Sequence, residues 1–172
     1  MQTLENIFSR RSVRAFTNQP ISAEQMETII KAGAAAPSGS NAQMWAFVAV
    51  RDAKRIMALR SLSPGVIGSP AAVVVLCLDR SHPNAALLEK GDIAPYLDMG
   101  AAMQNMLLAA NELGLAGCPV ASFHHQAIIS FLKLPEHLQP VLMLVMGFPK
   151  FVPQAPQKRP LSEIYFEESY HA

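Results

Sequence analysis

The sequence AAVVVLCL at residues 71–78 places the strongest constraint on the fold of this chain. It is an uninterrupted apolar run of strand length, preceded by Pro70 and followed by Asp79. A strand without polar alternation predicts burial on both faces, so its sheet needs a covering layer on each side. The run is far shorter than the roughly 20 residues that span a bilayer, so it favours a protein interior over a membrane.

Helical patterns separate this strand from two others. Strands are expected at 46–50 and 141–148, an irregular elbow at 114–123, and helices at 21–36, 53–60, within 92–113 and at 126–134. Ser22 and Gln25 predict a capping box, Asp52 caps the next helix, and Gly114 ends the longest one. This order predicts a sheet protein of two or three layers, in which only three clear strands leave room for one donated by a second subunit.

The N-terminal residues predict a short helix capped by Thr3. Leu4, Ile7 and Phe8 recur at helical spacing and are expected to bury one face of it. The arginines of the following sequence, SRRSVR, would then lie where this helix ends.

Composition favours a subunit interface. The 172 residues predict one domain, 1–172, and 51% of them are hydrophobic while only 16% are charged, which is more apolar than a typical soluble monomer. Extra apolar surface is ordinarily hidden between subunits. The segment 148–172 has little periodicity but many large apolar residues, so we expect it to wrap a partner subunit.

Several classes of function are disfavoured. The net charge of +1 and the lack of a basic stripe argue against nucleic-acid binding. The N-terminus does not resemble a signal peptide and no apolar run could span a membrane, so a cytoplasmic protein is expected. Cys77 and Cys118 lack metal-ligand spacing, and His124 and His125 are adjacent, so no metal site is expected.

Two polar stretches could carry chemistry, each with a plainer alternative. Arg10, Arg11 and Arg14 surround Ser12, which suits a phosphate receptor. Composition alone favours the alternative, a solvated helix end that bonds its own carbonyl groups. The sequence PSGSNAQMW at 37–45 offers side-chain amides to a heterocycle edge, or is an ordinary turn that bonds its own backbone.

Four motifs in order resemble the nitroreductase family of FMN-dependent oxidoreductases. They are RRSVR, APSGSNAQMWAFVAV, the helix DMGAAMQNMLLAANELGLAGCPV, and VMGFP followed by QKRPLSE. The resemblance covers essentially the whole chain. It implies an α+β fold, a three-layer sandwich with a small, mostly antiparallel central sheet flanked by helices. It further implies a homodimer whose C-terminal tail wraps the partner, with two FMN molecules in the interface.

The resemblance also implies site residues, carried over position by position. The flavin-binding positions are Arg10, Arg11, Ser12 and Arg14 in one chain, with Pro37, Ser38, Asn41 and Gln43 reaching the flavin from the other chain, the elbow Pro119, Val120, Ala121 and Ser122, and Lys158 and Arg159 in the tail. Which arginine would contact the phosphate and which the ring stays open. No side chain is expected to act as a catalytic residue, because the chemistry belongs to FMN.

The implied activity moves reducing equivalents from NAD(P)H through FMN to nitroaromatic, quinone or similar electron-poor acceptors by a ping-pong mechanism. The alternative is a flavin-binding or sequestering protein with little turnover. Some family members carry an Asn and a Lys before the second strand, and SLSPGVIGSP at 61–70 has neither. Either Arg10 or Arg14 supplies that positive charge, or the flavin potential is lower than in such relatives.

Overall fold

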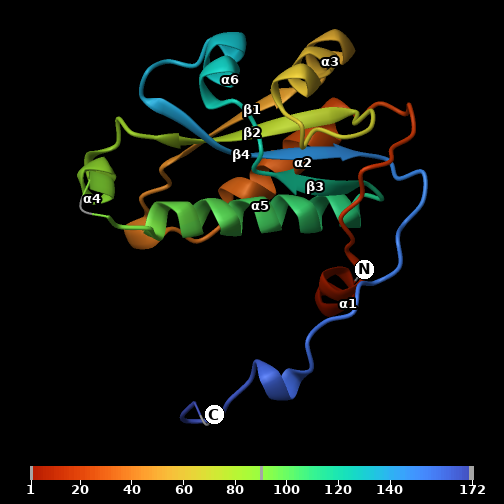
Figure 1. Cartoon of the computed structure of the whole chain (residues 1–172), viewed down its shortest axis with the longest axis vertical. Helices are drawn as coiled ribbons and strands as arrows, with labels where there is room; N and C mark the ends of the chain where they lie inside the picture. The colour runs from red at the N-terminus through yellow and green to blue at the C-terminus, as the bar shows by residue number, and fades with distance from the viewer. Residues whose placement is uncertain (1, 90, 171–172) are drawn as a thin grey trace.

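A four-stranded antiparallel sheet forms the centre of the molecule (Figure 1). The computed structural model describes residues 2–89 and 91–170. The strands are β1 (Trp45–Val50), β2 (Ala72–Asp79), β3 (Ala116–Val120) and β4 (Leu138–Gly147), in the spatial order β1-β2-β4-β3. The apolar run identified in the sequence is β2, which pairs with β1 on one side and β4 on the other. Residues 72–78 are all buried, as the sequence predicts.

Helices cover both faces of this sheet. The described helices are α1 (Thr3–Ser9), α2 (Ala23–Ala34), α3 (Ala53–Leu62), α4 (Ala86–Glu89), α5 (Ala94–Glu112) and α6 (His125–Leu132), with 3-10 turns η1 (Gly39–Asn41), η2 (Pro83–Ala85) and η3 (Leu161–Glu163). Val73, Val75 and Cys77 of β2 face the core under α3 and α6, whereas alternate residues of the same strand face the core under α2 and α5. The three-layer α+β sandwich expected from the resemblance is therefore confirmed.

Local signals fixed most helix boundaries. Ser22 and Gln25 form the expected capping box, and the Asp52 carboxylate accepts a hydrogen bond from the Arg55 N–H at 2.8 Å. Gly114 follows α5 with a φ of +73°, a left-handed conformation that glycine adopts without strain. The side chains of Ser22, Gln25 and Asp52 thus bond backbone groups that helix ends leave unpaired.

The expectation of an irregular elbow at 114–123 is wrong for its middle five residues. Residues 116–120 form β3, which pairs with β4 at the edge of the sheet. Pro119 is tolerated because an edge strand leaves one side of its backbone without a ladder partner. The fourth strand of the sheet thus comes from this chain.

The prediction that the first helix buries an apolar face is also wrong within the single chain. Leu4 and Phe8 are 66% and 71% exposed, and Asn6 is the buried residue of α1. Thr3 does not cap this helix, because its N-cap is Gln2 and no side-chain cap bond forms there. A polar side chain therefore attaches α1 to the body of the protein.

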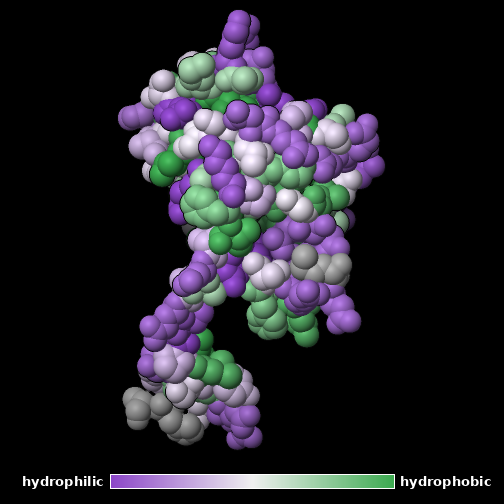
Figure 2. Space-filling view, turned by 90° about the vertical axis from the view of Figure 1, so that its right-hand side faces the viewer, coloured by the Kyte–Doolittle hydropathy of each residue, from purple (hydrophilic) through white to green (hydrophobic). Residues whose placement is uncertain are grey.

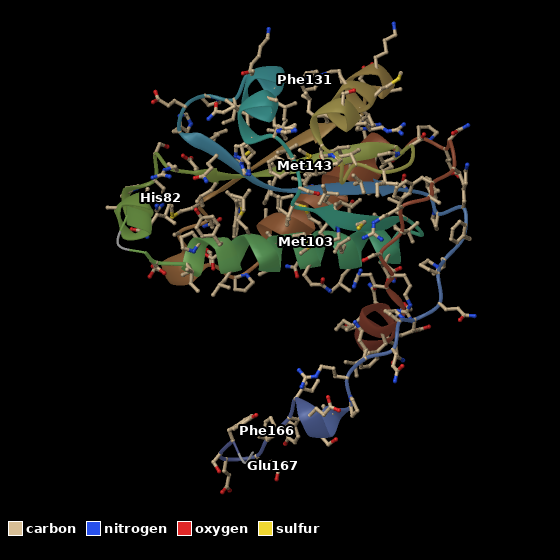
Figure 3. All side chains as sticks on the ribbon, viewed as in Figure 1. His82, Met103, Phe131, Met143, Phe166 and Glu167 are labelled. Carbon is tan, nitrogen blue, oxygen red and sulfur yellow. The ribbon has the colours of Figure 1, made fainter. Side chains whose placement is uncertain are left out.

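The tail beyond β4 runs away from the sheet as an arm (Figure 2). Its large apolar side chains are exposed within the single chain, namely Phe151, Val152, Leu161, Ile164, Tyr165, Phe166 and Tyr170. Figure 3 places Phe166 and Glu167 at the far end of this arm, remote from the sheet. None of the helices in the described part of the chain is long and apolar enough to cross a membrane.

Candidate functional site

Residues 10–14, with the sequence RRSVR, form the arginine segment, which lies beside β3, an edge strand of the sheet. Ser12 forms a parallel bridge with Gly117 of β3, and the Val13 N–H donates to the Gly117 carbonyl at 3.1 Å. Val13 and Phe16 are each only 2% exposed and anchor the segment in the core. The backbone between α1 and the core is therefore fixed, which restricts where Arg10 and Arg14 can lie.

The three arginines differ in their surroundings. Arg11 Nη1 donates to the carbonyl groups of Phe8 at 2.7 Å and of Arg10 at 2.8 Å. The plainer interpretation, a cation at a helix end bonding its own carbonyls, thus holds for Arg11. Arg10 is different, because its Nε and Nη1 are buried and have no hydrogen-bond partner among the described residues. Arg14 is exposed.

A cleft of about 520 Å³ brings the arginine segment and the tail together. Its lining residues are Ile7, Phe8, Arg10, Arg11, Ser12 and Arg14 from the N-terminal segment, and Pro153, Gln154, Ala155, Pro156 and Lys158 from the tail. Four of these side chains are cations and none is a carboxylate. A cleft of this charge favours an anion, and buried guanidinium N–H groups without partners are costly unless an anion accepts from them. The donors present therefore fit a phosphate group.

Arg159 does not join this cleft in the single chain. Its guanidinium bonds Glu163 instead, with Nε 3.2 Å from Oε2 and Nη2 donating to the Glu163 carbonyl at 3.1 Å. Lys158 is the tail cation that lines the cleft.

A loop before β2 connects the elbow to the arginine segment. Ser63 Oγ donates to the Ser122 carbonyl at 2.7 Å, and the backbone of Gly65 packs against Val120. Gly68 has a φ of +75°, and a Cβ at this position would overlap the Arg14 carbonyl oxygen. The loop 63–68 therefore contacts both the elbow, at Val120 and Ser122, and the backbone of Arg14.

Gly68→Ala is expected to lower the free energy of unfolding by about 1–2 kcal/mol, from the positive φ plus displacement of the Arg14 backbone. Gly91→Ala is the matched control, because Gly91 has a φ of +83° but a Cβ at this position would meet no atom within 4 Å. Chemical denaturation measures both. An equal loss in the two variants would contradict the close packing of Gly68 on Arg14.

The amide loop 37–43 is held in a strained conformation. Ser40, Asn41 and Gln43 have φ values of 51°, 54° and 50°, a region that side-chain-bearing residues rarely adopt. Ser38 Oγ accepts from the Gln43 N–H at 3.1 Å, and the Gly39 N–H donates to the Asp98 carboxylate of α5 at 3.1 Å. Strain of this kind persists where surrounding bonds fix it, and it concentrates at functional sites.

The amide loop and the arginine segment lie at opposite ends of α5. Gly39 bonds Asp98 near its start, whereas Asn6 bonds Leu108 and Glu112 near its end. Ten residues of helix separate Asp98 from Leu108, or about 15 Å along the axis. No residue of 37–43 lines the cationic cleft. A single chain therefore does not bring the two predicted halves of the site together.

The cysteines are structural. Burial raises the pKa of the Cys77 thiol to about 11, so it stays protonated and unreactive near neutral pH. Cys118 is buried and donates weakly to the Pro119 carbonyl at 3.4 Å. Within the described ranges, no three His, Cys, Asp or Glu side chains gather as metal ligands.

Sequence reasoning missed two parts of the site. The tail residues 153–156 line the cleft, although their proline-rich sequence carries no binding signal of its own. Asn6 bonds α1 to α5. In the sequence it is one amide between apolar residues of a short helix, and nothing there indicates that the amide would be buried while the apolar residues are exposed.

Comparisons with known proteins agree with this architecture. A family model described as "Nitroreductase family" matches residues 7–88 and 65–148. The chain is 31% identical over 178 residues to an NADPH-flavin oxidoreductase of Vibrio harveyi, covering 98% of this chain and 74% of that protein.

Solved structures are similar over nearly the whole chain. The NfrA1 nitroreductase of Bacillus subtilis superposes with a TM-score of 0.86 at 27% identity, covering 99% of this chain and 75% of the other. The NADPH:FMN oxidoreductase of Vibrio harveyi, solved with NAD+, gives a TM-score of 0.85 at 29% identity, covering 99% and 78%.

Proposed function

The chain belongs to the nitroreductase family, and we propose from this premise that it is an FMN-dependent oxidoreductase that uses NAD(P)H to reduce electron-poor acceptors. The observation that carries the proposal is the cationic cleft, where Arg10 holds buried N–H groups without a partner among the described residues. This cleft lies where the family's flavin-binding segment matches, and its donors suit the phosphate of FMN.

We assign the phosphate to Arg10 and Lys158. Both line the cleft, and the buried nitrogens of Arg10 provide donors that the described residues leave unused. Ser12 adds a hydroxyl to the same lining, while Arg11 supports the end of α1. Arg159 would reach the phosphate only if a second copy displaced Glu163 from it.

We assign Arg14 and the elbow to the flavin ring. The Arg14 backbone contacts the loop 63–68, which has no Asn or Lys, and we assign the Arg14 charge to the place that those residues take beside the pyrimidine. Pro119 and Val120 hold the end of β3, and the exposed Ala121 and Ser122 present backbone N–H groups at the sheet edge. Positive charge and amide donors at these places stabilise negative charge on a reduced ring.

The remaining contacts come from a second copy of the chain in this proposal. Ser38, Asn41 and Gln43, with Pro37 fixing the turn, lie at the far end of α5 from the cleft. Exposed apolar side chains on α1 and along the tail support a homodimer, with 148–172 wrapping the partner of a single domain 1–172. One FMN would then lie between the arginine segment of one copy and the amide loop of the other.

When bound, FMN accepts hydride from the nicotinamide and delivers electrons to a nitroaromatic, quinone or similar acceptor. The chain's own task is to hold and orient that group and to stabilise its charge. The sequence has no GxGxxG motif that would hold a dinucleotide at a separate site. NAD(P)H and the acceptor therefore occupy one space in turn in this proposal, which predicts ping-pong kinetics. A cytoplasmic location belongs to this proposal, since Cys77 and Cys118 are buried free thiols, as a reducing compartment favours.

The experiment is anaerobic reduction of the purified, flavin-loaded protein. NADPH or NADH should bleach the absorbance near the flavin maximum, and adding a quinone or nitroaromatic should restore it over many cycles. A flavin-binding protein without turnover is the second candidate, favoured by the lack of Asn and Lys in 61–70. Stable yellow colour without bleaching would support that candidate and overturn the oxidoreductase.

A further inference from the structure

Two polar side chains, Asn6 and Ser9, bond helix α1 to α5, and Asn6 makes most of these bonds. Asn6 Nδ2 donates to the Leu108 carbonyl at 3.0 Å and to Glu112 Oε2 at 3.4 Å, both on α5. Asn6 Oδ1 accepts from Asn111 Nδ2 at 2.8 Å. Figure 1 shows α1 below the C-terminal end of α5. Both halves of the amide are therefore used in a contact that the apolar residues of α1 do not make.

The same residue is bonded to the start of the arginine segment. Its carbonyl accepts from the Arg10 N–H at 3.1 Å and from Ser9 Oγ at 3.4 Å. Arg10 is the C-cap of α1, so its backbone position follows the orientation of that helix. Ile7 and Phe8, on the same turn as Asn6, line the cleft beside Arg10.

We infer that Asn6 is a positioning residue that sets Arg10 for the phosphate, and that it thereby gives the protein its preference for FMN over riboflavin. This inference rests on the proposed function, because it assumes that the cleft binds the phosphate of the flavin. Asn6 makes no contact with the flavin in this proposal. Its effect reaches the ligand through the Arg10 backbone, so it concerns the phosphate and leaves the ring contacts of the elbow unchanged.

An amide is the side chain that this position needs. Asn6→Asp would place a carboxylate against the Leu108 carbonyl and Glu112, replacing a donor with an acceptor at both contacts. The charged groups of the two packed helices are Glu5 on α1 and Asp98 and Glu112 on α5, with Arg10 and Arg11 following α1. Glu112 is the one that bonds the Asn6 amide, so the repulsion would arise mainly from it.

The test compares the dissociation constants of FMN and riboflavin in the full-length protein, measured by quenching of flavin fluorescence. Asn6→Asp should weaken FMN binding by about tenfold or more, as expected for a displaced charge-assisted bond. Riboflavin, which lacks the phosphate, should bind the variant within about twofold of the wild type. Adding Glu112→Gln to Asn6→Asp should restore part of the FMN affinity, because the introduced amide can donate to the introduced carboxylate.

Each other outcome overturns a different statement. If FMN and riboflavin weaken equally, or FMN affinity does not change, Asn6 does not act through the phosphate. If the wild type binds neither flavin, the proposed function fails, and this inference fails with it. Should Asn6→Asp not fold, Asn6→Ala tests the same discrimination without the added charge, with an expected FMN loss of about threefold or more.

Discussion

Arg10→Ala is expected to weaken FMN binding by about a hundredfold while leaving the apoprotein as stable as the wild type. Two hydrogen bonds from a buried guanidinium to a phosphate are worth about 3 kcal/mol together, which corresponds to this change in the dissociation constant. Within the described chain, Arg10 Nε and Nη1 have no partner, so their removal breaks no bond that the fold uses. Fluorescence titration gives the affinity, and thermal unfolding without flavin gives the stability.

Arg55→Ala is the control for loss of one positive charge. Arg55 lies on α3, where its guanidinium is 5.5 Å from the Phe131 ring centroid, and it does not line the cleft. Its FMN affinity should stay within about twofold of the wild type, since distant exposed charges are screened. Equal FMN affinities for Arg10→Ala and Arg55→Ala would show that the phosphate binds elsewhere.

The double variant Leu161→Asp, Ile164→Asp is expected to raise the dimer dissociation constant by about a hundredfold or more. Each side chain buried in an interface contributes about 1.5–3 kcal/mol, and a buried carboxylate adds an opposing desolvation penalty. Both residues are exposed in the single chain, at 67% and 54%, so the substitutions should not disturb the core of the protomer. Light scattering after size exclusion should report the protomer mass of 18.7 kDa for the double variant.

Ser162→Asp is the control, because it adds one carboxylate, half the charge of the double variant, at a polar position of η3. It is expected to stay dimeric and to retain its flavin. A double variant that remained dimeric at low micromolar concentration would contradict the proposal that the tail wraps a second subunit.

Much of the fold could be predicted from the sequence because local signals were strong. The apolar run of β2 and the caps at Ser22, Asp52 and Gly114 each depend on neighbours close in the chain. Residues 116–120 were predicted as irregular because Gly117 and Pro119 are poor strand formers. Their strand depends on pairing with β4, a contact that only the tertiary structure supplies.

The sequence suggested residues for the candidate site but not how the fold arranges them. Spacing and resemblance identified Arg10, Arg14 and Lys158, and the structure places all three at one cleft. Nothing local could distinguish Arg10 from Arg11, since the difference lies in which guanidinium reaches the carbonyl groups at the end of α1. The role of Asn6 likewise depends on α5, about 100 residues further along the chain.

The most direct test of a flavin site shared between two chains mixes two defective variants. Arg10→Ala damages the cleft, and Asn41→Ala with Gln43→Ala damages the amide loop. If each site takes its cleft from one copy and its loop from the other, every heterodimer has one intact site. Random exchange of equal amounts should then restore high-affinity FMN binding at about a quarter of all sites. Binding in the exchanged mixture no better than the average of the two separate variants would contradict the shared site.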